Sequence, residues 1–432
     1  MLFRSWSLQY RVPVLALLVV LFALAWWLSA PYTMSGFDTT TRWDDSEEIT
    51  SEPIMERRFV SSDLDEFVHS SSITTLPNGD LLSVWFAGSR EGAADVQIRG
   101  ARFDAASGEW SDEEVLATRE MTRESVGKPI RKLGNPVLAL APDERLWLFY
   151  VSVSLGGWAG SAINVMVSED QGITWTEPRQ LITSPFINIS TLVRSAPLFH
   201  QDGSIGLPVY HEFLGKFPEY LYLDSDGRVV DKFRMADGTN SLQPTVVALD
   251  ELRAIALLRY AGEEKGHVLA TVTADAGQTW SEERFVDPWN PNSSLAAVRS
   301  HRGTLLVAQN NLADGRFRLT LDEASFNLRN WSLINTIDES TDENGDPIPL
   351  ATYQPLMRDK FLEASGPKRQ VLLDEYMQLM EGRVCSRGLC NFDYEYPYMI
   401  RSHDGRFHMV YSWNNSFIKH VTFNRAWLEE QK

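Results

Sequence analysis

Two short stretches of the sequence place a carboxylate between hydroxyl side chains at a fixed spacing. S-E-D-Q-G-I-T-W occupies residues 168–175, and the near copy T-A-D-A-G-Q-T-W occupies residues 273–280. Such a group could take part in catalysis. It could also hold a turn, because Asp accepts hydrogen bonds from amides a few residues further on and Gly takes a positive φ. We favour the turn, since its chemistry is complete within each stretch.

The elements around these turns form a repeat. From residue 53 onward, the chain alternates an apolar strand, a turn of the D-G or N-G type and a second apolar strand. The turns of six such hairpins fall near residues 79, 144, 203, 251, 302 and 405. Most intervals are about 50 to 65 residues, which suits a four-stranded sheet. We therefore predict an all-β fold, a six-bladed β-propeller, over residues 53–432.

The long interval between the last two turns contains a polar insertion, at about residues 335–392. Its segment Gln370–Glu381 has helical spacing of apolar residues. Cys385 and Cys390, the chain's two cysteines, could form one small-loop disulfide. The acidic run 338–346 lacks the closing Glu of a calcium loop, so a solvated loop is favoured. No metal site and no cofactor are expected, because no metal or phosphate-binding motif is present.

The N-terminal segment, residues 1–30, differs from the rest of the chain. Val12–Ala30 carries no charge and follows Arg4 and Arg11, while acidic residues come after it. This length and these flanks predict an N-terminal transmembrane helix, with the bulk of the chain outside the cytoplasm, on the periplasmic or extracellular face. A cleaved signal peptide is the alternative. Residues 31–52, polar and acidic, are then a linker.

The overall charge limits the partners. The chain has a formal net charge of -18, and its Lys and Arg residues form no long run. Nucleic-acid binding is therefore not expected, because neutralising phosphates requires a basic surface. The partner is neutral, or it reaches a locally basic pocket.

The repeated stretch S-x-D-x-G-x-T-W resembles the Asp box of the sialidase (neuraminidase) superfamily. The stretches G-S-R-E-G-A-A-D, S-L-Q-P-T, N-P-N-S-S and E-Y-P-Y-M-I are similar to the sialidase-like branch that carries BNR repeats. Together these motifs span about residues 55–427. The resemblance implies a six-bladed propeller and a glycosidase of the exo-sialidase type that acts on an anionic glycan.

The resemblance also implies roles for particular residues. Sialidases bind the substrate carboxylate with three arginines, attack with a tyrosine that is paired with a glutamate, and use an acidic residue as general acid and base. By position in the motifs, Arg259 matches the second arginine. Tyr396 best matches the nucleophile, with Tyr394 and Tyr398 as close alternatives. Glu91 matches the acid/base residue, and Asp95 lies nearby in the same motif.

Other positions depart from the family pattern. His69 stands where the first arginine is expected, and Gln243 stands where the partner glutamate is expected. Asn310 and Asn311 lie around the position of the third arginine. Asn292, in N-P-N-S-S, is counted among the substrate-binding residues.

Four further residues are candidates for substrate binding at predicted strand ends. Arg194 starts a strand and is followed by small residues, so it has no obvious local partner and is expected to be functional. Arg90 is either a ligand or a solvated loop residue. His211 and Glu212 either face the ligand or form a hydrogen-bonded pair between blades.

These features together predict an extracytoplasmic, membrane-anchored glycoside hydrolase that acts on an acidic sugar. One alternative is a carbohydrate-binding propeller without catalysis, which the missing arginines and glutamate favour. The other is a polysaccharide lyase, in which His69 or His211 acts as the base and a tyrosine as the acid. A hydrolase releases a reducing sugar and a lyase releases an unsaturated uronide.

Overall fold

The computed structural model divides the chain into two compact units, Met1–Ser35 and Gly36–Lys432. The residues that the structure describes are 8–28, 33–39, 52–64, 66–184, 188–263, 266–301, 303–339, 346–366 and 370–431. Most of the predicted linker and most of the acidic run 338–346 lie outside the described residues.

The first unit contains one helix, α1 (Leu8–Leu28), with Pro13 in its interior. The prediction of a transmembrane helix is corrected here: among the described residues, no helix is long and apolar enough to cross a membrane. Gln9 and Arg11 fall in the first turn of α1, so its apolar stretch is shorter than the roughly 20 residues that a bilayer requires.

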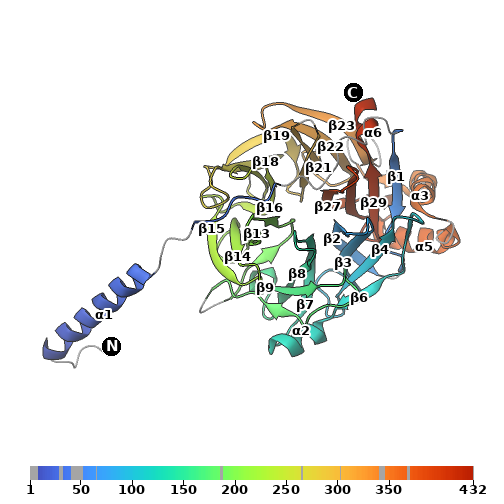
Figure 1. Cartoon of the computed structure of the whole chain (residues 1–432). Coiled ribbons are helices and arrows are strands. Elements are labelled where there is room, and N and C mark those ends of the chain that lie inside the picture. Colours follow the sequence, from blue (N-terminus) through green and yellow to red (C-terminus); the bar gives the residue numbers. More distant parts are fainter. Residues whose placement is uncertain are drawn as a thin grey trace. The chain divides into compact units, whose positions relative to one another are not determined.

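Most of the second unit consists of six antiparallel sheets of four or five strands (Figure 1). Their strands follow one another in chain order, except that β1, from the start of the unit, joins the last sheet. Sheet 1 contains β2 (Phe67–Thr75), β3 (Leu81–Gly88), β4 (Gln97–Asp104), β5 (Glu109–Trp110) and β6 (Glu114–Ala117). Sheet 2 contains β7 (Lys132–Leu140), β8 (Leu146–Val153), β9 (Ser161–Ser168) and β10 (Arg179–Gln180). Sheet 3 contains β11 (Leu192–Val193), β12 (Leu198–Phe199), β13 (Ile205–His211), β14 (Phe217–Leu223) and β15 (Val229–Arg234).

The remaining sheets continue the pattern. Sheet 4 contains β16 (Ser241–Ala248), β17 (Ala254–Tyr260), β18 (Gly266–Thr273) and β19 (Arg284–Asn290). Sheet 5 contains β20 (Ala296–Arg299), β21 (Thr304–Gln309), β22 (Arg318–Ser325) and β23 (Trp331–Glu339). Sheet 6 contains β27 (Tyr394–Arg401), β28 (Phe407–Trp413), β29 (Phe417–Phe423) and β1 (Met55–Phe59). Short helices α2 (Arg119–Val126) and α6 (Arg425–Glu430) lie outside the sheets.

The all-β class is therefore observed, but the predicted fold class needs a second correction. Strands pair across each of the six predicted turns, and the first strands of successive sheets contact one another, β27 with β2 included. Each sheet is nevertheless open, and none closes on itself. The six-bladed propeller is thus not confirmed, because hairpin spacing along the sequence reports how strands pair within a sheet and not how sheets close.

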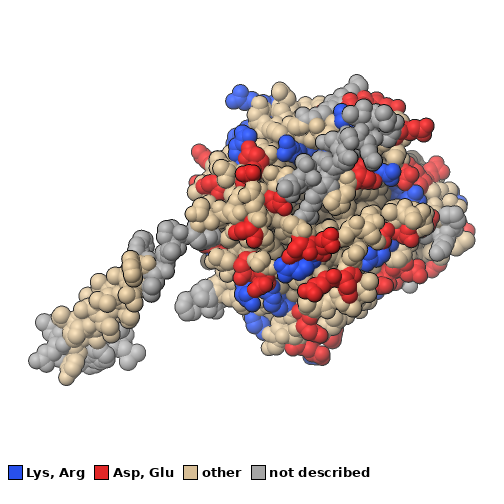
Figure 2. Space-filling model, in the orientation of Figure 1, with Lys and Arg blue, Asp and Glu red and all other residues tan. Residues whose placement is uncertain are grey.

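Buried apolar side chains join the sheets to one another. One cluster contains Trp85 of β3, Trp147 of β8, Val209 of β13 and Val410 of β28, all almost fully buried. Leu242 of β16 belongs to the same cluster, so five of the sheets share one core. On the face that Figure 2 shows, acidic side chains are interspersed with basic ones.

The two repeated octapeptides form turns, and the Asp side chain of each turn is hydrogen-bonded within its own octapeptide. Asp170 accepts bonds from the Thr174 amide (2.8 Å), the Thr174 hydroxyl (2.6 Å) and the Ser168 hydroxyl (2.8 Å). The bond from the Thr174 hydroxyl contributes most to lowering the pKa of Asp170 to about 2. Asp275 makes the same bonds with Thr279 and Thr273. The carboxylates are thus turn residues, as the local chemistry indicates.

Asp275→Ala is expected to lower the free energy of unfolding by about 1–3 kcal/mol, because the amide and hydroxyls of the turn lose their acceptor. Asp170→Ala should change stability in the same direction. The measurement is urea unfolding followed by tryptophan fluorescence, with ligand affinity determined on the folded protein. Loss of affinity without loss of stability would show that the turn assignment is incorrect.

The insertion between β23 and β27 is largely helical. It contains α3 (Leu350–Ala364), α5 (Leu373–Val384) and a small sheet of β24 (Ile348–Pro349), β25 (Cys385–Ser386) and β26 (Leu389–Cys390). Cys385 and Cys390 form a disulfide. Helix α5 overlaps the predicted helical segment Gln370–Glu381, whereas α3 was not predicted. Asp338 of β23 fastens α3 to the sheets, because it binds Lys360 of α3 (2.5 Å) and Lys419 of β29 (2.7 Å).

Candidate functional site

The first strand of each sheet carries, within it or just before it, a non-glycine residue in the left-handed region. These residues are Ser70 (φ 56°), Asn135 (44°), Ser190 (63°), Gln243 (48°), Asn292 (58°) and Tyr396 (54°). In sheets 1, 2, 4 and 6 the residue interrupts the register between the first two strands. Non-glycine residues rarely take this conformation, and strained positions of this kind cluster at functional sites. The equivalent placement in every sheet marks one end of the first strands as the candidate site.

Three of these residues meet around Arg259, at the end of β17. The Arg259 guanidinium donates from Nε to Asn292 Oδ1 (2.7 Å) and from Nη1 to Gln243 Oε1 (3.1 Å). Nη1 also donates to the hydroxyl of Tyr396 (3.4 Å), which accepts a second bond from Gln243 Nε2 (3.3 Å). The structure thus brings together four predicted site residues that lie up to 153 positions apart in sequence.

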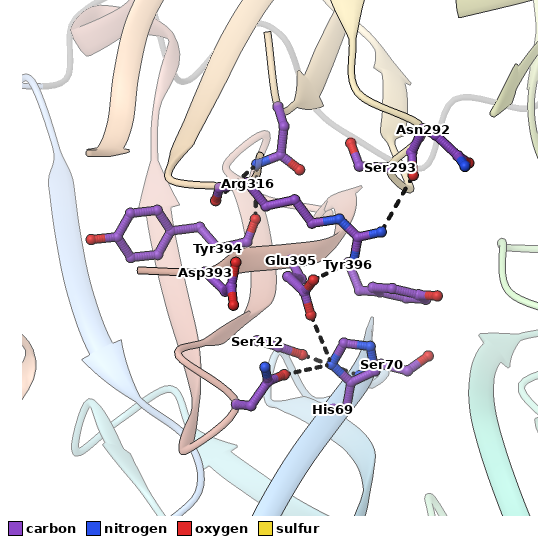
Figure 3. Close-up of polar contacts among 12 residues, drawn as sticks. His69, Ser70, Asn292, Ser293, Arg316, Asp393, Tyr394, Glu395, Tyr396 and Ser412 are labelled. Carbon is purple, nitrogen blue, oxygen red and sulfur yellow. Dashed lines mark hydrogen bonds and ion pairs between the residues drawn. The ribbon is translucent and has the colours of Figure 1, made fainter. Parts of the chain in front are cut away.

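A second cluster lies beside Tyr396. Figure 3 shows Glu395 between Arg316 and His69. Glu395 forms an ion pair with Arg316 and lies 3.6 Å from Nδ1 of His69, which is 3.0 Å from Oδ1 of Asn415. The His69 ring packs against the Tyr396 ring, with centroids 4.3 Å apart.

Burial and the neighbouring charged groups shift the pKa values of the titratable side chains in this cluster. Burial lowers the pKa of His69, against the effect of Glu395. Burial opposes the charge of Arg316, but the ion pair with Glu395 raises the pKa of its guanidinium overall. Burial and the neighbouring Glu395 carboxylate raise the pKa of Asp393 to about 6. The site therefore holds an imidazole whose charged form is disfavoured by burial, a fixed ion pair and a carboxyl group with a pKa of about 6.

Arg194 lies next to Tyr396, with its guanidinium 5.2 Å from the centre of the Tyr396 ring. Its guanidinium is almost fully buried and donates to the backbone carbonyls of Ser71 (3.2 Å), Tyr396 (2.6 Å) and Pro397 (3.1 Å). Burial lowers the pKa of Arg194 to about 10. This residue supports the backbone of Tyr396, and its role in substrate binding stays a prediction.

The loop after β3 carries the predicted acid/base residue. Glu91 and Arg90 are exposed. Asp95 accepts bonds from the amide and hydroxyl of Ser89, both at 3.0 Å, and so holds the loop together. Glu91 lies within electrostatic reach of His69 and of Lys132, whose pKa burial lowers. Glu91 therefore borders the site, whereas Asp95 has a structural partner.

His211 and Glu212 do not form a pair, and each has different neighbours. His211 lies 2.6 Å from Glu219 of the adjacent strand β14, so it pairs within its own sheet and not with Glu212. Glu212 is partly buried, and burial raises the pKa of its carboxyl group, against the effects of Lys216, Arg259 and Lys132. Glu212 thus belongs to the charged surroundings of Arg259.

Sequence reasoning missed three residues of the site: Arg316, Glu395 and Asp393. The guanidinium near the predicted third-arginine position belongs to Arg316. Asn310 instead donates to the carbonyl of Tyr394 (2.9 Å), and Asn311 to Asp322 (3.4 Å). The available signal was the run D-Y-E-Y-P-Y, in which Asp393 directly precedes β27 and Glu395 is the second residue of that strand, next to Tyr396.

A cavity of about 330 Å³ opens at the opposite end of the first strands. Its lining includes Thr75, Val247, Val298 and Ile400, and none of the residues around Arg259. Within the described part of the chain, no group of three or more His, Cys, Asp or Glu side chains could hold a metal ion.

Comparisons with known proteins give the family and the fold of the chain. Residues 79–409 match the family model of the BNR repeat-like domain. No curated protein matches the chain. Among solved structures, it is similar to the K499G mutant of the NanB sialidase from Streptococcus pneumoniae, with 10% identity, a TM-score of 0.60, and coverage of 88% of this chain and 72% of that one.

Two intramolecular trans-sialidases are also similar. The enzyme from Ruminococcus gnavus has 12% identity and a TM-score of 0.59, and the match covers 89% of this chain and 99% of that chain. The leech enzyme has 11% identity and a TM-score of 0.60, and the match covers 89% and 72%. At these identities the likeness establishes a shared fold.

Proposed function

The chain belongs to the BNR repeat-like domain family and to the sialidase-like superfamily, and on this basis we propose that it is a glycoside hydrolase that removes an acidic sugar from a glycan. The observation that carries the proposal is the contact of Arg259 with Gln243 and Tyr396, two of the left-handed residues in the first strands of the sheets. It supplies a cation and an oxygen nucleophile within one small site.

Arg259 is suited to bind the carboxylate of the sugar. Asn292 and Gln243 fix the plane of its guanidinium through Nε and Nη1. Nη2 of Arg259 makes no hydrogen bond with the described residues. A guanidinium held in this way binds a carboxylate with little further loss of side-chain freedom. Arg316 is less suited, because Glu395 already neutralises it.

Tyr396 is suited to attack the anomeric carbon. Its oxygen accepts N–H bonds from Arg259 and Gln243, and both donors stabilise the phenolate that forms when the hydroxyl gives its proton to water. The phenolate oxygen bonds to the anomeric carbon as the bond from that carbon to the leaving oxygen breaks, and the leaving oxygen takes up a proton. Glu212 is the better proton donor for the leaving oxygen, because burial raises the pKa of its carboxyl group. Glu91, the acid expected from the sequence, is exposed.

One observation favours a second candidate function. His69 has its Nδ1 held by Asn415 and Glu395, and its ring packs against Tyr396. An oriented, neutral imidazole next to a tyrosine suits a polysaccharide lyase, in which the base removes a proton next to the uronate carboxylate. The products distinguish the two functions, because elimination introduces a double bond and hydrolysis does not.

Arg259→Ala is expected to weaken binding of an acidic glycoside by about 2–4 kcal/mol, since a charge-assisted bond in a partly buried site is lost. Binding of the matched glycoside in which an amide replaces the carboxylate should change little. The measurement is calorimetric titration of both ligands. Arg253→Ala is the control, because Arg253 forms an exposed pair with Asp250 in the turn at the other end of β17. Equal losses for both ligands would contradict carboxylate binding.

A further inference from the structure

A row of aromatic rings crosses the surface of sheet 4. Tyr260 of β17, His267 of β18 and Phe285 and Trp289 of β19 form this aromatic row. The centroid distances are 5.1 Å for Tyr260 and Phe285, 5.8 Å for His267 and Phe285, and 4.9 Å for His267 and Trp289. Trp289 is 50% exposed and Phe285 45% exposed. The row therefore presents ring surface to solvent.

The backbone is shaped to hold Trp289 in this position. Trp289 lies directly across from His267 in the pairing of β19 with β18. The next residue of β18 toward its start is Gly266, at φ +102°, and a Cβ atom there would lie 2.4 Å from the Trp289 ring. Only glycine allows the ring to lie against the strand at this point. The exposed ring is thus packed on one side and open on the other.

A cavity of about 310 Å³ adjoins the aromatic row. Tyr260 and Phe285 form part of its wall, and the rest is formed by Leu269 and residues 237–241 and 282–284. Glu283 accepts hydrogen bonds from the amides of Asp237 (3.0 Å) and Gly238 (2.7 Å), which hold the loop 237–241 in place. The cavity thus combines aromatic surface with carboxylate and amide groups.

The segments that line the cavity are adjacent in sequence to residues of the candidate site. The loop 237–241 leads directly to Gln243, and Tyr260 follows Arg259. Strand β19 ends at Asn290, two residues before Asn292. The three segments that carry Gln243, Arg259 and Asn292 therefore also border the aromatic row and its cavity. A ligand that extends beyond Arg259 toward these segments meets the cavity next.

We propose that the cavity and the aromatic row bind the neutral sugars that follow the acidic sugar of the glycan. This inference rests on the proposed function and names the rest of its substrate. Trp289 and Phe285 offer flat apolar surface to the C–H faces of sugar rings, and Asp237 and Asn240 offer partners for hydroxyl groups. The carboxylates of Asp237, Glu282 and Glu283 outnumber the guanidinium of Arg284 in the cavity wall. A second acidic sugar is disfavoured here, because like charges repel.

Binding of neutral tetrasaccharides tests the proposal without reference to turnover. The full chain is titrated with lacto-N-tetraose, cellotetraose and maltotetraose in a calorimeter. We expect at least one to bind, and Trp289→Ala and Phe285→Ala each to weaken that binding by about tenfold or more. Trp289→Phe should restore part of it. Leu252→Ala is the matched control, because Leu252 is 51% exposed in the turn at the other end of sheet 4.

Two results would overturn the proposal: binding of none of the three tetrasaccharides, or binding that Trp289→Ala and Phe285→Ala leave unchanged. Thermal melts of each variant show that the fold is retained. Arg259→Ala separates this proposal from the proposed function, since it should abolish selectivity for the acidic sugar and leave the affinity for the neutral tetrasaccharide unchanged. An absence of sugar release together with loss of tetrasaccharide binding in Trp289→Ala would reject hydrolysis and support the aromatic row.

Discussion

Tyr396→Phe is expected to reduce release of the acidic sugar by roughly a thousandfold or more, while binding of the same sugar is kept. The substitution removes only the oxygen that Arg259 and Gln243 hold, at 3.4 and 3.3 Å, and leaves the ring against His69. The measurement is a pair of experiments on one acidic oligosaccharide: the single-turnover release rate and the calorimetric affinity.

Two carboxylate variants complete this test. Glu212→Gln should lower release by about a hundredfold because it removes the proton donor, and Glu91→Gln should lower it less. Full release by Tyr396→Phe would eliminate tyrosine as the nucleophile. If that variant still formed a product that absorbs in the ultraviolet, and His69→Ala did not, the lyase function would replace hydrolysis.

Asp338→Asn is expected to lower the free energy of unfolding by about 3–5 kcal/mol, the largest stability effect expected for one substitution in this chain. Asp338 is 2% exposed and binds Lys360, Lys419, Tyr411 (3.0 Å) and Trp413 (3.1 Å). Loss of its charge leaves the fully buried Lys419 without a counterion. Urea unfolding of the variant and the unmodified chain gives the difference.

The pH dependence follows from the same group. Burial alone would raise the pKa of Asp338, but Lys419 and Lys360 lower it to about 2. The group therefore contributes stability that is present above the unfolded value of 3.8 and is lost as the pH falls toward 2. Asp374→Ala is the control, because Asp374 forms an exposed pair with Arg358. Equal stability of Asp338→Asn and this control would contradict the structural role of Asp338.

The parts of the fold that were predictable from the sequence are local. Turn residues specified the hairpins, and the octapeptides contained all the groups that Asp170 and Asp275 bind. The transmembrane helix and the six-bladed propeller depend on more than local turn chemistry, and both predictions are corrected. Helix α3 was missed because Pro355 and its mixed face give little helical periodicity.

The candidate site was predicted in part. Arg259 and Tyr396 were found because their motifs resemble those of sialidases. Glu395 and Arg316 were missed because their ion pair joins residues 79 positions apart, in different segments. Arg194 has no obvious partner nearby in the sequence, because its partners are backbone carbonyls more than 120 positions away. A left-handed Tyr396 could not be read from the sequence, because no local signal marks a non-glycine residue for that conformation.

Hydrolysis in water enriched in oxygen-18 tests the central proposal most directly. The full chain is incubated with acidic oligosaccharides in the labelled water, and the released sugar is analysed by mass spectrometry. Water completes the hydrolysis of a glycosyl-tyrosine, so the released acidic sugar should carry one oxygen-18 atom at its anomeric carbon. An unsaturated product without the label, or binding with no release, would contradict the assignment of this chain as a glycoside hydrolase.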